Sequence, residues 1–255
     1  MRTYTNEPTE QSGYCFLIYS KPNYGKTHSF GTLQGKTKLI VTEPKDSRSV
    51  LGYAGENVDY VECDNFDEYM ELLVGMEREA REGTLAYDNI GFDSLSFLQS
   101  RFELELEDNR YEARTEKEKA RAGLIDRFRI DQADWGGLAS ILIRISSSLN
   151  RLSKYGKVCI ATATEVENPK FDMSVTYAPS FTGRKFPSVV NGFFDLIGRV
   201  IEPWAIREDG TVRPPAVSFV SDNGDFIARC TGKLAPKGKR LPLDYAKILN
   251  VLRKG

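Results

Sequence analysis

The chain has 255 residues, of which 40% are hydrophobic, and its formal net charge is −1. This length and composition suit one large α/β domain. The balanced charge excludes a global basic field, so any contact with nucleic acid must come from a local patch. The single histidine argues against a histidine-based zinc site or a Ser-His-Asp triad. The four cysteines share no metal-ligand spacing, and we expect buried thiols in a reducing compartment.

The first 13 residues are polar and lack the apolar core of a signal peptide. We expect them to form a flexible lead-in to a single domain over residues 14–255. No apolar stretch approaches the length of a membrane span, so we expect no membrane contact and a cytoplasmic protein.

An apolar run over residues 14–19 predicts a buried parallel strand, and Gly25-Lys26-Thr27 follows it at the start of a helix. This order is typical of a phosphate-binding loop, in which backbone N–H groups surround the phosphates. Lys26 would reach the β- and γ-phosphates, and Thr27 would bind Mg²⁺. Ser20 stands where the pattern expects its first glycine. The alternative is a chance Gly-Lys-Thr in a surface turn. The predicted nucleotide-binding residues are Ser20, Lys21, Pro22, Asn23, Tyr24, Gly25, Lys26, Thr27 and His28.

Strands and helices then alternate, which predicts a mostly parallel sheet with helices on both faces. A charge-dense excursion over residues 108–134 is either a solvated helix or a mobile segment. The expected strands are 38–42, 58–62, 86–92 and 157–164, and the expected helices are 26–33, 66–82, 94–107 and 135–154.

The remainder of the chain has a different character. Residues 166–187 contain proline, glycine and serine and predict a long loop. Asp209-Gly210 and Asn223-Gly224 are typical hairpin turns, so we expect antiparallel hairpins over 193–206 and 216–230. A helix over 243–252 closes the chain.

Acidic residues follow several predicted strands, at the edge where parallel α/β sheets bind ligands. Asp93 would hold Mg²⁺ through water, or would cap the next helix, a role that Ser94 could also fill. Glu43 is the first candidate for the general base that activates water, and its alternative is a solvated turn residue. Glu165 is the second candidate, as a water-orienting group or a sensor of the γ-phosphate.

The order of these motifs resembles the phage RecA-like ATPases, short relatives of the RadA-type recombinases that include single-strand annealing proteins of the Sak group. Ser20 and the 108–134 excursion depart from that pattern. The resemblance spans most of the chain and rests on Gly25-Lys26-Thr27, Leu39–Glu43, Ile90–Leu95, Asp134–Gly136, Val158–Glu165, Pro179–Lys185 and Ala228–Leu234.

The resemblance implies a RecA-like P-loop fold and Mg²⁺-dependent hydrolysis of ATP. It further implies annealing or strand exchange on single-stranded DNA in the host cytoplasm, by a ring or filament of identical subunits, with a single-strand binding protein as a further partner. Arg229 and Lys233 would be candidates for a finger reaching the neighbouring subunit's site, or simply exposed hairpin residues.

Basic and aromatic residues interleave in the 166–187 segment, a pattern that suits single strands. Lys170, Arg184 and Lys185 are the candidate DNA-binding cations; in the alternative, this is a structural loop with its aromatic rings turned inward. A rival function is a nucleotide-switched assembly module of phage replication or packaging with little turnover. A small-molecule kinase is disfavoured, because nothing resembles an arginine-rich lid.

Overall fold

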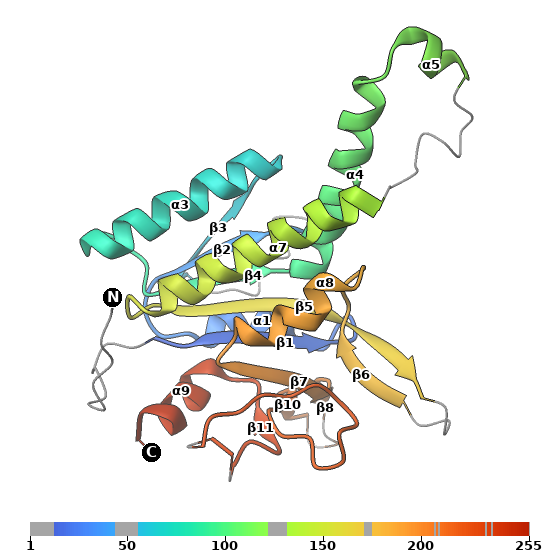
Figure 1. Ribbon diagram of the computed structural model, residues 1–255. Helices are drawn as coiled ribbons and strands as arrows, with labels where there is room; N and C mark the ends of the chain where they lie inside the picture. The colour runs from blue at the N-terminus through green and yellow to red at the C-terminus, as the bar shows by residue number, and fades with distance from the viewer. Residues whose placement is uncertain are drawn as a thin grey trace.

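The computed structural model describes residues 13–43, 56–121, 132–170, 175–206, 208, 210–232, 234–235 and 237–254. Within these residues, nine strands form one mixed sheet with helices on both faces (Figure 1). Lys233 and most of the predicted lead-in lie outside the described residues, so the expectations placed on them stay predictions.

The sheet has the strand order β11-β10-β7-β1-β5-β4-β2-β3, and the six strands from β7 to β3 run parallel. Three strands are antiparallel to their neighbours: β10 pairs β7, β11 pairs β10, and β6 pairs β5. The prediction of a mostly parallel sheet with C-terminal antiparallel strands is therefore confirmed. The bounds are β1 (Cys15–Ser20), β2 (Thr37–Val41), β3 (Val58–Glu62), β4 (Asn89–Asp93), β5 (Val158–Pro169), β6 (Val175–Pro179), β7 (Leu196–Glu202), β10 (Ala216–Ser218) and β11 (Leu241–Pro242).

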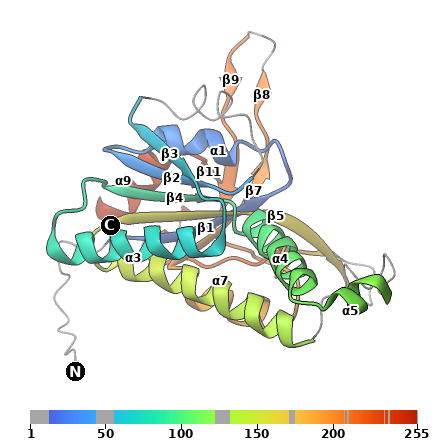
Figure 2. The ribbon, with the colours of Figure 1, turned by 90° about the horizontal axis from the view of Figure 1, so that it is seen from above.

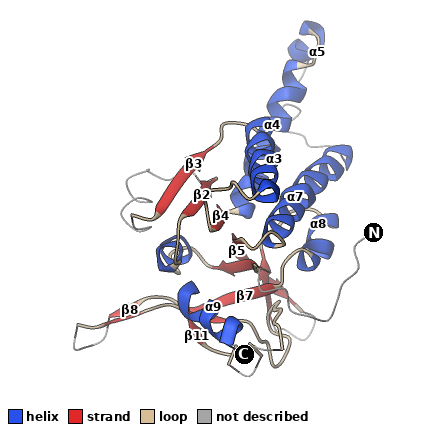
Figure 3. Ribbon diagram, turned by 90° about the vertical axis from the view of Figure 1, so that its left-hand side faces the viewer, coloured by secondary structure: helices blue, strands red, loops and turns tan. Residues whose placement is uncertain are grey.

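The central strand β1 is buried on both faces, which explains its unbroken apolar sequence. Its odd-numbered side chains, including Leu17, enter a core shared with α3 (Phe66–Glu82), α7 (Gln132–Ser153) and α8 (Lys185–Val189). Its even-numbered apolar side chains enter a second core, shared with η1 (Phe30–Thr32) and α9 (Tyr245–Lys254). Figure 3 shows the strands between these two groups of helices.

The helices follow the predicted boundaries closely, and α3 matches its predicted range residue for residue. The predicted helix over 26–33 is shorter, because α1 (Lys26–Ser29) passes into η1 at Phe30. No helix among the described residues is long and apolar enough to cross a lipid bilayer.

The charged excursion contains helix on both sides of its undescribed part. Helix α4 (Leu95–Glu112) continues into a short α5 (Glu116–Arg121), and both project from the body of the molecule (Figure 1). An ion pair of 2.7 Å between Arg110 and Asp134 ties this arm to the start of α7. Residues 116–121 are helical and residues 116–118 are exposed, as expected of a solvated helix.

The prediction of a long loop over residues 166–187 is wrong. Strand β5 runs on to Pro169, and β6 pairs with it from Glu165↔Pro179 to Pro169↔Val175, so the segment forms a β-hairpin followed by α8. Of the three prolines in this segment, Pro169 and Pro179 are the last residues of β5 and β6, and Pro187 lies in α8. A proline at a strand end removes no ladder hydrogen bond from the strand interior, so both strands persist.

One of the two predicted C-terminal hairpins is also wrong. Strands β8 (Ala205–Ile206) and β9 (Val212–Arg213) pair across a turn that contains Gly210, as predicted. The residues after Asn223-Gly224 do not pair with β10; instead Phe226 bridges to β6, and Arg229 bridges to β7. The reason is that both edges of β10 are already occupied, by β7 and β11.

Candidate functional site

The loop after β1 folds around the side chain of Lys26. This ammonium is buried, and it donates to the Ser20 carbonyl at 3.1 Å, the Ser20 hydroxyl at 2.9 Å and the Lys21 carbonyl at 3.1 Å. A lysine ammonium has three N–H donors, and charge-assisted bonds of this kind are the stronger ones. Lys26 therefore holds the loop closed from inside.

Two residues of the loop have left-handed backbone conformations, Asn23 with φ 63° and Gly25 with φ 81°. Asparagine is one of the few residues besides glycine that adopt this region readily. Alternation of left- and right-handed residues turns successive N–H groups toward one concave side, which favours an anion there. A Cβ at position 25 would lie 2.5 Å from Nε1 of Trp204, so the site admits only glycine.

The substituted first position of the loop has a structural explanation. Ser20 is the last residue of β1, and it is not among the residues with positive φ, so the backbone there requires no glycine. Its buried hydroxyl accepts from Lys26 and donates to the Lys21 carbonyl at 2.9 Å. Serine thus supplies an oxygen for the lysine that glycine would lack.

The two residues predicted to organise Mg²⁺ meet directly. Oγ1 of Thr27 donates to Oδ2 of Asp93 at 2.6 Å, and the hydroxyl of Thr162 donates to the other carboxylate oxygen at 2.5 Å. Asp93 is fully buried. The helix cap is Ser94, whose hydroxyl accepts from the amide of Phe97, so the choice between the two capping residues falls on Ser94.

Thr42 connects the end of β2 to this corner, and no sequence pattern predicted a role for it. Its amide donates to the Asp93 carbonyl at 2.8 Å, and its hydroxyl both donates to the Ser94 carbonyl at 2.6 Å and accepts from the Ser94 amide at 2.7 Å. The peptide bond between Asp93 and Ser94 is cis. The half-buried Glu43 follows Thr42, two residues after Val41, whose partner in the sheet is Asp93.

Glu165 lies at the same edge of the sheet but is bound to Arg199. Nε and Nη2 of Arg199 donate to its carboxylate at 2.6 and 3.3 Å, and the Glu165 side chain is only 1% exposed. Burial works to lower the pKa of Arg199, but the hydrogen bond and charge of Glu165 raise it above its ordinary value. The guanidinium also lies 3.5 Å from the centre of the Tyr177 ring. A carboxylate held in this way is poorly placed to activate a water molecule.

Sequence reasoning missed Arg199. The available signal was a single cation inside the apolar strand β7. In the sheet, Arg199 pairs with Tyr19 on β1, and Ser20 on β1 pairs with Thr164 on β5. Those two registers bring position 199 level with Ala163, two residues before Glu165 on β5. Recognising the pair required knowing that β5 and β7 flank β1, which the sequence did not show.

The candidate DNA residues are exposed but not gathered. Lys170 lies beyond the end of the β5–β6 hairpin, whereas Arg184 and Lys185 lie past its base at the start of α8. The first and last paired residues of the hairpin on β5, Glu165 and Pro169, are four residues apart. At the usual rise per residue of a strand this is about 13 Å. The ring centroids of Phe181 and Phe186 are 4.7 Å apart, and Phe186 is buried. These two aromatic rings are therefore turned inward, as in the alternative of a structural loop.

The candidate finger residue Arg229 makes a contact within its own chain. Nη1 donates to the carbonyl of Asn191 at 2.5 Å, and the side chain is otherwise exposed. A role in a neighbouring subunit's site stays a prediction.

Oxygen ligands suited to Mg²⁺ are present at Thr27 and Asp93, although no group of three or more His, Cys, Asp or Glu residues in the described parts of the chain could hold a metal alone. Such a donor set fits Mg²⁺, which proteins commonly bind through one or two carboxylates together with substrate phosphates.

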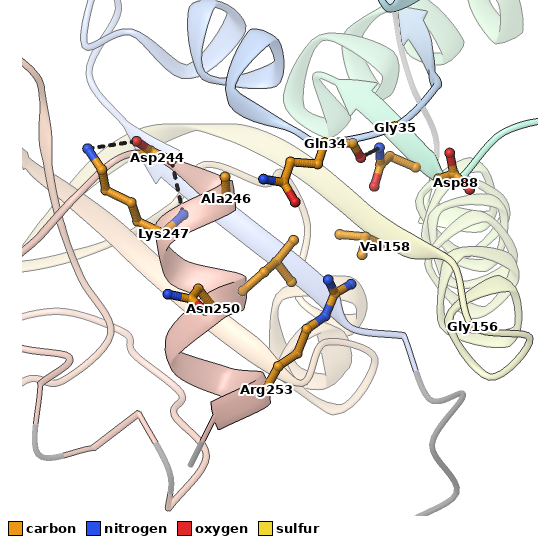
Figure 4. A pocket seen from close by; sticks show the side chains of 12 residues that line it. Gln34, Gly35, Asp88, Gly156, Val158, Asp244, Ala246, Lys247, Asn250 and Arg253 are labelled. Carbon is orange, nitrogen blue, oxygen red and sulfur yellow. Dashed lines mark hydrogen bonds and ion pairs between the residues drawn. The ribbon is translucent and has the colours of Figure 1, made fainter.

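A cavity of about 700 Å³ lies at the other edge of the sheet (Figure 4), between α9 and the starts of β4 and β5. Val158, Asp88 and Arg253 are among its lining residues. None of the predicted site residues that the structure describes contributes to it, so it is separate from the loop that carries Lys26.

No protein-family model matches this chain, and no curated protein matches it in sequence.

Proposed function

We propose that this chain is a Mg²⁺-dependent P-loop ATPase of the RecA-like kind. One observation carries the proposal: Thr27, at the start of α1, donates its hydroxyl hydrogen to Asp93 at the end of β4, beside a loop closed around Lys26. A hydroxyl and a carboxylate that meet beside such a loop are the groups that organise Mg²⁺ and the β- and γ-phosphates in P-loop hydrolases.

Each residue then has a definite task. Lys26 exchanges its loop oxygens for phosphate oxygens and stabilises the charge that develops during transfer. Thr27 and Asp93 orient the metal, which supplies charge neutralisation on the phosphates when bound. Glu43, positioned by Thr42, orients and polarises the attacking water. Glu165 takes no part in this reaction, because its carboxylate is bound to Arg199.

The nucleotide loop is joined to the β5–β6 hairpin, which we propose as part of a surface for single-stranded DNA. Lys21 of the loop forms a 2.7 Å ion pair with Glu167 on β5, and Tyr19 donates to the carbonyl of Ile227 beside β6. Lys170, Arg184 and Lys185 offer phosphate contacts. In this proposal the protein anneals or exchanges strands as an oligomer, with Arg229 reaching a neighbour's site.

The test is ATP hydrolysis with Mg²⁺, measured with and without single-stranded DNA, while light scattering records the oligomeric state. We expect turnover that rises with DNA and disappears in Lys26→Ala. Lys154→Ala removes an exposed lysine just past the end of α7 and serves as the matched control. Normal ATP binding by Lys26→Ala would overturn the loop assignment.

A nucleotide-switched assembly module is the second candidate, and the arm of α4 and α5 favours it, because it offers a surface projecting from the ATPase body (Figure 1). ATP binding that changes the oligomeric state without turnover or salt-sensitive DNA binding would select this function over the first.

A further inference from the structure

Trp204 forms a wall of the loop that carries Lys26. It follows β7, the strand next to β1, and its Nε1 lies only 2.5 Å from where a Cβ of Gly25 would be. Its ring meets the ring of His28 edge-on, with centroids 4.8 Å apart. Even so, 37% of the Trp204 residue surface remains exposed, so part of the ring is open to solvent.

The strand order fixes which side of the loop this wall occupies. Asp93 ends β4, which is separated from β1 by β5, whereas Trp204 follows β7 on the opposite side of β1. If Lys26 and the Thr27–Asp93 pair hold the β- and γ-phosphates, the nucleoside has to leave the loop away from Asp93, past His28. This step rests on the proposed function.

The short hairpin beyond Trp204 carries two exposed apolar side chains. Ile206 and Val212 pair directly across β8 and β9, and they are 79% and 57% exposed. Figure 2 shows this hairpin standing beside α1. Exposed apolar groups beside a half-exposed indole suit the flat face of a nucleobase rather than a sugar or a phosphate.

We propose that Trp204 is the nucleobase platform of the site, with the base stacked on its indole and the edge of His28 closing the subsite. Stacking discriminates by the area of the ring more than by its hydrogen-bonding edge. The platform therefore favours purine over pyrimidine triphosphates and distinguishes ATP from GTP only weakly.

The two tryptophans of the chain give a direct readout. In Trp135→Phe, Trp204 is the only tryptophan, and we expect ATP to quench its fluorescence while inorganic tripolyphosphate does not. In Trp204→Phe, the remaining Trp135 should not respond to ATP. Trp204→Ala should bind ATP about tenfold more weakly, about 1.4 kcal/mol, with unchanged affinity for tripolyphosphate.

Equilibrium dialysis distinguishes a failure of the nucleobase-platform proposal from a failure of the ATPase proposal. If Trp135→Phe binds ATP without quenching and Trp204→Ala binds ATP as the unaltered protein does, the platform is wrong and the ATPase proposal stands. If the unaltered protein binds neither ATP nor tripolyphosphate, both proposals fall. Tripolyphosphate binding by Trp204→Ala and near-normal ATP affinity in Trp204→Phe show that the loop is intact.

Discussion

Oγ1 of Thr27 lies 2.6 Å from Oδ2 of Asp93, although the two residues are 66 positions apart in the chain. The contact joins the first turn after the loop to the end of a strand two places away in the sheet. A hydroxyl and a buried carboxylate so arranged can share one Mg²⁺ when phosphates complete its ligands. The pair is thus the geometric centre of the proposed site.

Replacing Asp93 by asparagine should weaken the site's hold on Mg²⁺. In the proposed site Asp93 holds Mg²⁺ through water, so we expect a loss of about 10- to 100-fold in metal affinity or activity, typical of groups behind the ligands. The measurement is the Mg²⁺ dependence of ATP hydrolysis. Asp88→Asn, at the other edge of the sheet, is the matched control; equal losses in both variants would count against the Mg²⁺ role.

Glu43→Gln and Glu165→Gln separate the two candidate bases. Glu43→Gln should lower single-turnover hydrolysis about 100-fold or more while ATP affinity stays nearly constant, because only proton abstraction is lost. Glu165→Gln should instead lower stability, since its carboxylate is buried against Arg199. A folded Glu165→Gln protein that binds ATP but does not hydrolyse it would show that Glu165 is the base.

The Glu165–Arg199 pair should reveal itself in stability. Arg199→Met leaves a buried carboxylate without its partner, a change that typically costs about 3–5 kcal/mol in the free energy of unfolding. Glu165→Leu combined with Arg199→Met should recover much of that loss, because no buried charge remains. Urea denaturation of both proteins measures the difference. A double variant as unstable as the single one would mean that packing of the arginine on Tyr177 dominates.

Cys63 provides a test by pH. Burial raises the pKa of its thiol from 9.0 to about 11, so the folded state holds this proton more tightly than the unfolded state. The resulting stabilisation is complete below about pH 9 and is lost as the pH rises to about 11. The difference in free energy of unfolding between the unaltered protein and Cys63→Ala should shrink over that range. A constant difference would contradict the shift.

DNA binding by the exposed cations should appear as salt dependence. Each phosphate contact on a single strand contributes about 0.7 to the slope of log affinity against log salt, so replacing Lys170, Arg184 and Lys185 with alanine should lower that slope by about 2. Replacing Lys36, Lys247 and Arg253, at the other edge of the sheet, is the matched control. An unchanged slope in the first variant would remove these residues from the DNA surface.

Local chemistry was enough to predict most elements. Residues 66–82 carry an apolar stripe at helical spacing, and the observed helix has those bounds. Buried parallel strands such as β1 can be predicted from unbroken apolar runs. The prediction of a loop over residues 166–187 was wrong because Pro169 and Pro179 mark strand ends, and because pairing with β5 is a long-range property that composition does not carry.

Local patterns were enough to predict that a strand leads into Gly25-Lys26-Thr27 and that carboxylates lie near the ends of other strands, because hydrophobic period and loop chemistry are local. Which of these groups come into contact depends on the fold of the whole chain. The strand order places Thr27 within hydrogen-bond distance of Asp93 and pairs Glu165 with Arg199. It also packs Trp204 against Gly25 of the loop. Contacts between distant segments depend on which strands are neighbours in the sheet, and pairing partners are chosen by the packing of the whole fold.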